Sequence, residues 1–106
     1  MATELNLIAD IGADGRPRVT AAGEIDLSNI EAFTNALETA SAGTRGPITV
    51  DLSAVKYLDS AGINALFEQA DHVDDLHLIV HPLLIRVLTI SGLTKIANVE
   101  AGPTKT

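Results

Sequence analysis

The clearest structural signal in the chain is the segment Ile48-Thr-Val-Asp-Leu-Ser-Ala-Val-Lys-Tyr-Leu-Asp-Ser-Ala-Gly-Ile63. It opens with a β-branched and apolar run, residues 48–52, which predicts a buried strand. Apolar residues then recur at helical spacing and predict a helix that begins near Ala61. The apolar face of that helix is expected to consist of Ile63, Leu66, Phe67 and Ala70. A buried strand joined by a short connection to a helix is typical of a parallel α/β sheet.

Two strands and a helix are predicted on the N-terminal side of this segment. Apolar and polar residues alternate over residues 5–11 and again over residues 18–23. A Gly-Ala-Asp-Gly turn signal lies between them, so the two strands are expected to form a hairpin. A helix over about residues 29–40 follows, and the spacing of Ser28 and Glu31 predicts a capping box at its start.

A strand over residues 76–80, a third helix and a last strand over residues 96–99 are predicted on the C-terminal side. Pro82 suits the first turn of the third helix, and Gly92 suits its C-terminal cap. The chain is therefore expected to be a single α/β domain over residues 1–106, with a mixed sheet of four or five strands and helices mainly on one face. The residues expected to be buried are Phe33, Leu37, Val50, Leu52, Leu66, Phe67, Leu78, Val80 and Leu88.

Composition and charge narrow the classes of function. The chain has no cysteine, which rules out a disulfide framework and a thiolate metal site. The formal net charge of −7 leaves no basic surface of the kind that nucleic acids and anionic membranes bind. The N-terminus has no signal-peptide pattern, and polar residues interrupt the most apolar region, residues 76–93. A cytoplasmic protein without a membrane span is therefore expected.

No residue pattern points to catalysis, a metal or a cofactor. His72, His77 and His81 do not form an obvious ligand set with the nearby aspartates, so a solvated acidic loop is the favoured interpretation. Ser60 has no identifiable base, and the sequence lacks a Gly-x-Ser-x-Gly elbow and a glycine-rich phosphate loop. The chain is therefore not expected to be an enzyme or to need a cofactor.

The start of the helix near Ala61 is the candidate functional site. Either Asp59 or Ser60 is expected to cap this helix, beside free backbone N–H groups and the positive end of the helix dipole. A phosphate on the Ser60 hydroxyl would be tolerated there, because helix N-termini accept anions. Gly62 leaves the first turn without a side chain, so a partner's backbone is expected to approach closely. An Asp-Ser pair before a helix is, by itself, usually only a cap.

The segment as a whole resembles the core motif of STAS domains, which occur in sulfate transporters and anti-sigma factor antagonists. In the antagonists this motif runs from a strand through Asp-Leu-Ser and two apolar positions to Asp-Ser-(Ser, Thr or Ala)-Gly-Leu. Gly23-Glu-Ile-Asp-Leu-Ser28 resembles the stretch between the family's second strand and first helix. Val87-Leu-Thr-Ile-Ser-Gly-Leu93 resembles its third helix and the glycine that ends it. The resemblance covers roughly residues 19–93.

The resemblance implies a partner-switching mechanism without intrinsic catalysis. The unphosphorylated antagonist binds an anti-sigma factor, usually a serine kinase, and the sigma factor is released. The kinase then phosphorylates the serine after the motif aspartate, which is Ser60 here, and a phosphatase resets the switch. The partner-binding residues that the resemblance implies are Glu24, Asp26, Asp59, Ser60, Ala61 and Gly62.

The sequence departs from the family at two points. Ala61 stands where some relatives have a second hydroxyl residue, which argues for a single modification site. Family members usually end with an amphipathic helix, which residues 100–106 cannot form because Gly102 and Pro103 would break it. The final helix is therefore expected to be missing or very short, and a partner or a homodimer is expected to cover that surface.

The alternative function is a STAS domain of an anion or lipid transport system that acts as a regulatory binding module. The intact Asp-Ser motif, a start at Met1 and the lack of a membrane segment favour the antagonist. A scaffold subunit of a large signalling assembly is a third alternative, which the expected absence of an extra N-terminal domain disfavours.

Overall fold

The computed structural model describes residues 4–41 and 46–102, which form five strands, three α-helices and one short 3-10 helix. In chain order the elements are β1 (Leu5–Ile11), β2 (Pro17–Ile25), α1 (Ile30–Ser41), β3 (Ile48–Leu58), α2 (Ser60–His72), β4 (Leu76–Val80), α3 (Pro82–Ser91), the 3-10 helix η1 (Leu93–Lys95) and β5 (Asn98–Ala101).

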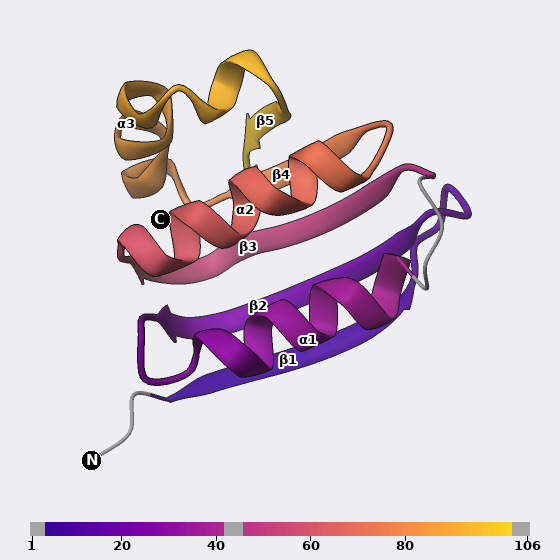
Figure 1. Cartoon of the computed structure of the whole chain (residues 1–106), viewed down its shortest axis with the longest axis horizontal. Helices are drawn as coiled ribbons and strands as arrows, with labels where there is room; N and C mark the ends of the chain where they lie inside the picture. The colour runs from indigo at the N-terminus through magenta and orange to yellow at the C-terminus, as the bar shows by residue number, and fades with distance from the viewer. Residues whose placement is uncertain (1–3, 42–45, 103–106) are drawn as a thin grey trace.

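The strands form one mixed sheet in the order β1-β2-β3-β4-β5 (Figure 1). β1 and β2 are antiparallel, and each later pair of neighbouring strands is parallel. Both the predicted hairpin and the predicted mixed sheet are confirmed. Because β2, β3 and β4 are parallel, the loops that follow them all leave the sheet at the same end.

β3 is the central strand and is longer than the sequence predicted. Residues 48–52 pair with β4, while β2 runs alongside β3 from Thr49 to Leu58 with two register shifts. The predicted strand ended at Leu52, whereas the observed strand continues through Lys56 and Tyr57 to Leu58. The side chains of Lys56 and Tyr57 are exposed, and pairing with β2 alone extends the strand through them.

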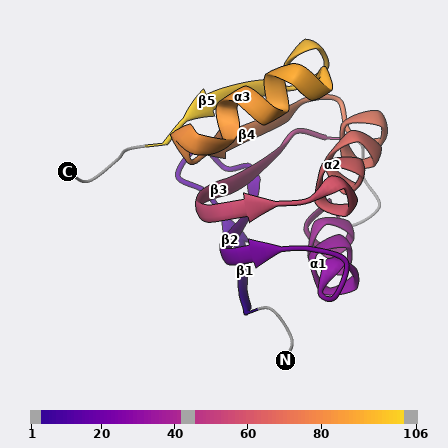
Figure 2. The ribbon, with the colours of Figure 1, turned by 90° about the vertical axis from the view of Figure 1, so that its left-hand side faces the viewer.

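α1 and α2 lie side by side on one face of the sheet, and α3 lies near the β4–β5 end (Figures 1 and 2). The core fills the space between these helices and the sheet. Phe67 was predicted to be buried, and this prediction is wrong, because its side chain is only partly buried at the margin of the core. The remaining predicted core residues are confirmed as buried: Phe33, Leu37, Val50, Leu52, Leu66, Leu78, Val80 and Leu88.

The buried face of α2 is shifted by one position along the helix from the predicted one. The side of the helix that faces the sheet consists of Gly62, Ala65, Leu66 and Gln69. Of the predicted face, only Leu66 is fully buried, while Ile63, Phe67 and Ala70 pack at its edge. The predicted face was based on the large apolar residues. In the structure the small residues Gly62 and Ala65 face the sheet, which lets the helix pack closely against it.

The starts and ends of the helices only partly follow the prediction. α1 begins at Ile30, and the Ser28 hydroxyl donates to Asp26 Oδ1 at 2.6 Å, so the predicted capping box with Glu31 is wrong. For α3 the prediction is confirmed, with Pro82 in the first turn and Gly92 as a left-handed C-cap at φ 92°.

The C-terminal part contains one element that the sequence did not predict. η1 follows α3 directly, and β5 consequently begins at Asn98, two residues later than predicted. Residues 100–101 belong to β5, and residues 103–106 lie outside the described residues. The expectation that the final family helix is missing or very short therefore stays a prediction.

The three histidines serve separate local contacts. His72 contacts the Glu68 carbonyl oxygen, His77 pairs with Glu100, and His81 accepts from the backbone N–H of Leu83 as the N-cap of α3. Among the described residues, no group of histidine and acidic side chains has the arrangement of a metal site.

Candidate functional site

Asp59 is the N-cap of α2, which settles the choice that the sequence left open between Asp59 and Ser60. Its Oδ1 accepts from the backbone N–H groups of Ala61, at 2.9 Å, and Gly62, at 3.2 Å. An aspartate in this position satisfies donors that have no partner within the helix and places negative charge at the positive end of the helix dipole. The carboxylate thereby fixes where α2 begins.

The same carboxylate joins the two loops that follow β2 and β3. Asp59 Oδ2 accepts from the backbone N–H of Leu27 at 3.2 Å, and the Asp59 backbone N–H donates to the Ile25 carbonyl oxygen at 3.2 Å. These contacts hold the β2–α1 loop against the first turn of α2. We call the β2–α1 loop, residues 26–29, together with the N-cap and first turn of α2, residues 59–62, the switch site.

Ser60 is the first residue of α2, and its side chain is exposed. Ala61 follows it and is partly buried. Since Asp59 Oδ1 already binds the N–H groups of Ala61 and Gly62, the hydroxyl of Ser60 is not the cap. The switch site therefore presents the serine hydroxyl to the outside while the aspartate beside it faces inward to the backbone.

Gly62 is buried, which contradicts the prediction that a partner's backbone approaches there. A Cβ atom at this position would collide with Leu58 Cδ1 and lie 3.0 Å from Ile25 Cγ2. Glycine is therefore required because α2 packs directly on the ends of β2 and β3. The motif glycine serves internal packing, and of the predicted partner-binding residues it is the one that the structure places inside.

Glu24 and Asp26 lie on either side of the end of β2. Glu24 is exposed, and its backbone carbonyl oxygen accepts from Asn29 Nδ2 at 2.8 Å. Asp26 Oδ1 accepts from the Ser28 backbone N–H at 2.9 Å, a turn that orders the loop. Glu24, Asp26 and Asp59 thus come from the same end of two adjacent strands.

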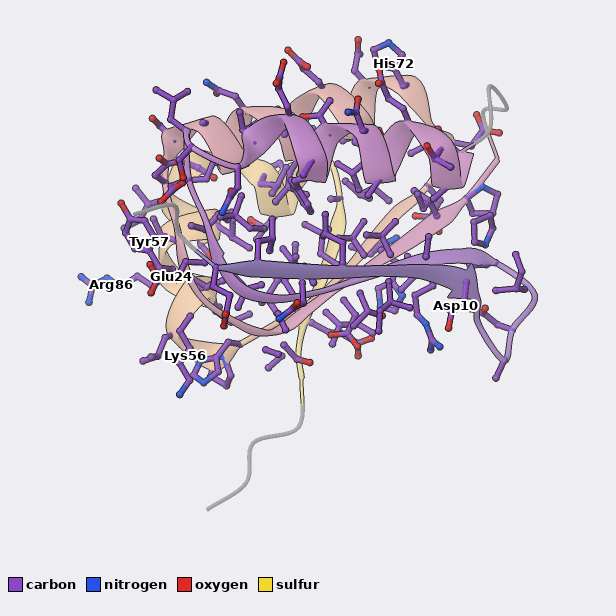
Figure 3. All side chains as sticks on the ribbon, turned by 90° about the horizontal axis from the view of Figure 1, so that it is seen from below. Asp10, Glu24, Lys56, Tyr57, His72 and Arg86 are labelled. Carbon is purple, nitrogen blue, oxygen red and sulfur yellow. The ribbon has the colours of Figure 1, made fainter. Side chains whose placement is uncertain are left out.

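Two exposed apolar side chains that the sequence did not predict lie beside these residues. Leu27 is 75% exposed in the middle of the switch site, and Tyr57 is 50% exposed on β3, directly across from Glu24 in the strand register. Figure 3 places Glu24 and Tyr57 at the same end of the molecule, together with Lys56 and Arg86. A leucine between polar loop residues was the available signal, since exposed apolar residues grouped together often mark contact surfaces.

Comparison with known proteins assigns the family. The family model described as "Mlab, STAS domain" matches residues 9–99. The fold and this match define a STAS domain, and the chain belongs to the STAS domain family. No curated protein matches the chain significantly.

Solved structures of similar fold include anti-sigma factor antagonists. An anti-sigma factor antagonist from Mycobacterium paratuberculosis is 25% identical, with a TM-score of 0.80 over 95% of this chain and 87% of that one. The antagonist SpoIIAA in its unphosphorylated form is 17% identical, with a TM-score of 0.69 over 90% of this chain and 88% of that one. An uncharacterised DUF3478-family protein with a SpoIIAA-like fold, from Shewanella loihica PV-4, is 14% identical, with a TM-score of 0.63 over 99% and 90%.

The part of the chain that the structure describes has no helix that is both long and apolar enough to cross a membrane.

Proposed function

We propose that the chain is an anti-sigma factor antagonist whose unphosphorylated form binds an anti-sigma factor of the serine-kinase type and thereby frees a sigma factor. Phosphorylation of Ser60 by that kinase ends the binding, and a phosphatase restores it. The partner contacts Asp26, Leu27 and Ser60 of the switch site, together with the neighbouring Glu24 and Tyr57. The similarity to solved antagonists supports the proposal.

The observation that carries the proposal is the position of Ser60 next to a cap that is already satisfied. A phosphate adds about −1.5 to −2 charges and three strong acceptors. Asp59 holds the first-turn N–H groups of Ala61 and Gly62, so these donors are not free to neutralise the phosphate. The added charge therefore stays in solvent on the outer surface, where a bound partner would have to desolvate it.

The energies favour a switch in binding over a switch in folding. In the free protein the positive end of the helix dipole stabilises the phosphate by about 0.3–1 kcal/mol, and water screens its repulsion from Asp59. At an interface that excludes water, like-charge repulsion from Asp59 grows several-fold. Each ~1.4 kcal/mol weakens binding tenfold, so phosphorylation is expected to weaken binding at least tenfold without unfolding the chain.

The test combines capture of the partner with phosphorylation. The unphosphorylated chain, immobilised in lysate of the source organism, is expected to retain an ATP-binding anti-sigma factor that mass spectrometry identifies. With the purified partner, Ser60→Ala is expected to bind normally and incorporate no label from ATP. Ser60→Asp is expected to bind at least tenfold more weakly while melting at the wild-type temperature.

A matched control tests whether the position of the added negative charge, and not merely its presence, weakens binding. Asn35→Asp adds the same charge at an exposed position of α1 and is expected to bind like the wild type. Label that still enters Ser60→Ala, or wild-type affinity of Ser60→Asp, would contradict the proposed switch.

The second candidate function is a regulatory module of an anion or lipid transport system. It is kept because the matching family model is named for Mlab and not for an antagonist. Capture of a permease or transport ATPase in the same experiment, with no anti-sigma factor retained, would establish this alternative.

A further inference from the structure

β1 is an edge strand without the usual protection against pairing. Among the described residues it pairs only with β2, and its other side lies at the edge of the sheet (Figure 1). The ladder with β2 is continuous from Leu5 to Ile11 without a bulge, and the strand contains neither lysine nor proline. Natural edge strands are usually shortened, bulged or charged. The other edge, β5, fits this rule because it has only four residues.

The hydrogen bonds with β2 identify the free backbone groups of β1. The Gly12 N–H donates to the Arg16 carbonyl oxygen at 2.8 Å, and the Glu24 N–H donates to the Glu4 carbonyl oxygen at 3.1 Å. In an antiparallel ladder these bonds occur at alternate residues. Even-numbered residues of β1 therefore face β2 with their N–H and C=O groups. The residues whose N–H and C=O groups face outward are Leu5, Leu7, Ala9 and Ile11.

The side chains of β1 leave this edge apolar and without a free charge. Ile8 and Ile11 are 62% and 65% exposed. The one charged residue of the strand, Asp10, is paired with Arg18 of β2 through two hydrogen bonds of 3.1 Å. These bonds hold the pKa of the Asp10 carboxyl below its usual value, so it remains an anion paired within its own chain.

We propose that β1 pairs antiparallel with β1 of a second copy of this chain, about a two-fold axis at Ile8. The outward N–H and C=O groups then meet as hydrogen-bonded pairs, and the two Ile8 side chains meet at a non-hydrogen-bonded pair, where side chains are closest. Apolar residues face apolar ones, and no like charges are opposed. The opposed pairs are Leu5 with Ile11, Asn6 with Asp10, Leu7 with Ala9, and Ile8 with Ile8.

The neighbouring registers are worse, which makes the pairing specific. An axis at Leu7 would oppose Glu4 to Asp10, two like charges, and an axis at Ala9 would oppose Ile8 to Asp10. Pairing about Ile8 leaves the switch site open, because β1 lies on the side of β2 away from β3. The dimer is an inference about the sheet edge, and it does not depend on the proposed function.

A single cysteine tests the register directly, because the natural chain has none. Opposed residues at a non-hydrogen-bonded pair have Cα atoms about 4.5 Å apart, within the roughly 4.4–6.8 Å that a disulfide spans. Ile8→Cys is therefore expected to form a disulfide-linked dimer under mild oxidation, seen on a non-reducing gel at twice the monomer's 11.1 kDa.

Two control variants separate this pairing from random collision. Asn6→Cys lies on the same face of β1 but opposes Asp10, and Ile90→Cys lies on α3 with 74% of the side chain exposed. Both are expected to crosslink at least about tenfold more slowly than Ile8→Cys. Crosslinking of Ile8→Cys at the controls' rate would overturn the proposed register.

Sedimentation of variants without cysteine tests the dimer itself. The mass of the wild-type protein is expected to rise with concentration from 11.1 kDa toward twice that value. Ile8→Lys places two like charges on the axis and is expected to stay monomeric, with a wild-type circular dichroism spectrum because Ile8 is exposed. Ile90→Lys is expected to dimerise like the wild type. A wild-type mass that stays at the monomer value up to about 1 mM, an affinity limit of about −4 kcal/mol, would overturn the proposal.

Discussion

At the scale of single residues, the switch site contains a side chain that stabilises the fold, Asp59, next to an exposed one, Ser60. Asp59 caps α2 and binds the Leu27 N–H, whereas the neighbouring Ser60 makes up the exposed start of the helix. Gly62 completes the turn by leaving room for Leu58 and Ile25. Most of the Asp-Ser-Ala-Gly motif is therefore explained by packing and capping, and the serine hydroxyl is the part that neither explains.

Gly62→Ala is expected to destabilise the protein. The added Cβ would overpack the buried contact with Leu58 and Ile25, at about 1–3 kcal/mol, and the better helix propensity of alanine would return roughly 1 kcal/mol. The difference, a net loss of up to about 2 kcal/mol, should appear in urea unfolding. Asn64→Ala, at an exposed position of the same helix, is the control and should change stability by less than about 0.5 kcal/mol. A Gly62→Ala protein as stable as the wild type would show that the first turn can move.

At the scale of elements, small residues on the buried face of α2 determine how closely the helix packs against the sheet. Gly62 and Ala65 lie on the buried face, one residue out of phase with the large apolar residues that the periodicity emphasised. Leu66 belongs to both faces and is fully buried. Leu66 is therefore the one large apolar side chain on the buried face, beside the small Gly62 and Ala65 and the polar Gln69, with Phe67 at the margin of the core.

Leu66→Ala is expected to lower the free energy of unfolding by about 2–5 kcal/mol, because it removes a fully buried side chain and leaves a cavity. Thermal or urea unfolding would measure the loss. Leu83→Ala is the matched control, since Leu83 is 70% exposed on α3 and the same truncation there should change stability by less than about 0.5 kcal/mol. Equal losses for the two variants would mean that the helix faces are assigned wrongly.

At the scale of the whole molecule, the sheet is paired unequally from centre to edge. β3 has a neighbour on each side, and its side chains Val50 and Leu52 are fully buried. β5 pairs with β4 alone through four residues, and Val99 is only partly buried. The order of strands also brings the loops after β2 and β3 together, which creates the switch site.

Amide hydrogen exchange should be slow in the central strand β3 and faster in the edge strand β5. The amides of β3 are expected to exchange only on global unfolding, whereas those of β5 should exchange on the order of a hundredfold faster through local opening. Exchange monitored by NMR on the wild-type protein would measure both. Equal protection of the Val50 and Glu100 amides, both of which face β4 in the ladder, would show that β5 unfolds only together with the rest of the sheet.

Local patterns in the sequence were sufficient for the order of the elements, the hairpin, most of the core and the position of the candidate switch serine. Alternation, helical spacing and the ends marked by Pro82 and Gly92 depend on neighbouring residues, so they are visible along the chain. Family resemblance supplied the proposed role of Ser60, which the local pattern alone would have assigned to a cap.

The tertiary structure decided the features that depend on contacts between distant residues. The second half of β3 exists because β2 pairs with it, and Gly62 is buried because Leu58 and Ile25 meet above it. The choice of Asp59 as the cap follows from its additional bond to the Leu27 N–H in another loop. Such choices depend on which segments become neighbours in space, and no pattern confined to one segment contains that information.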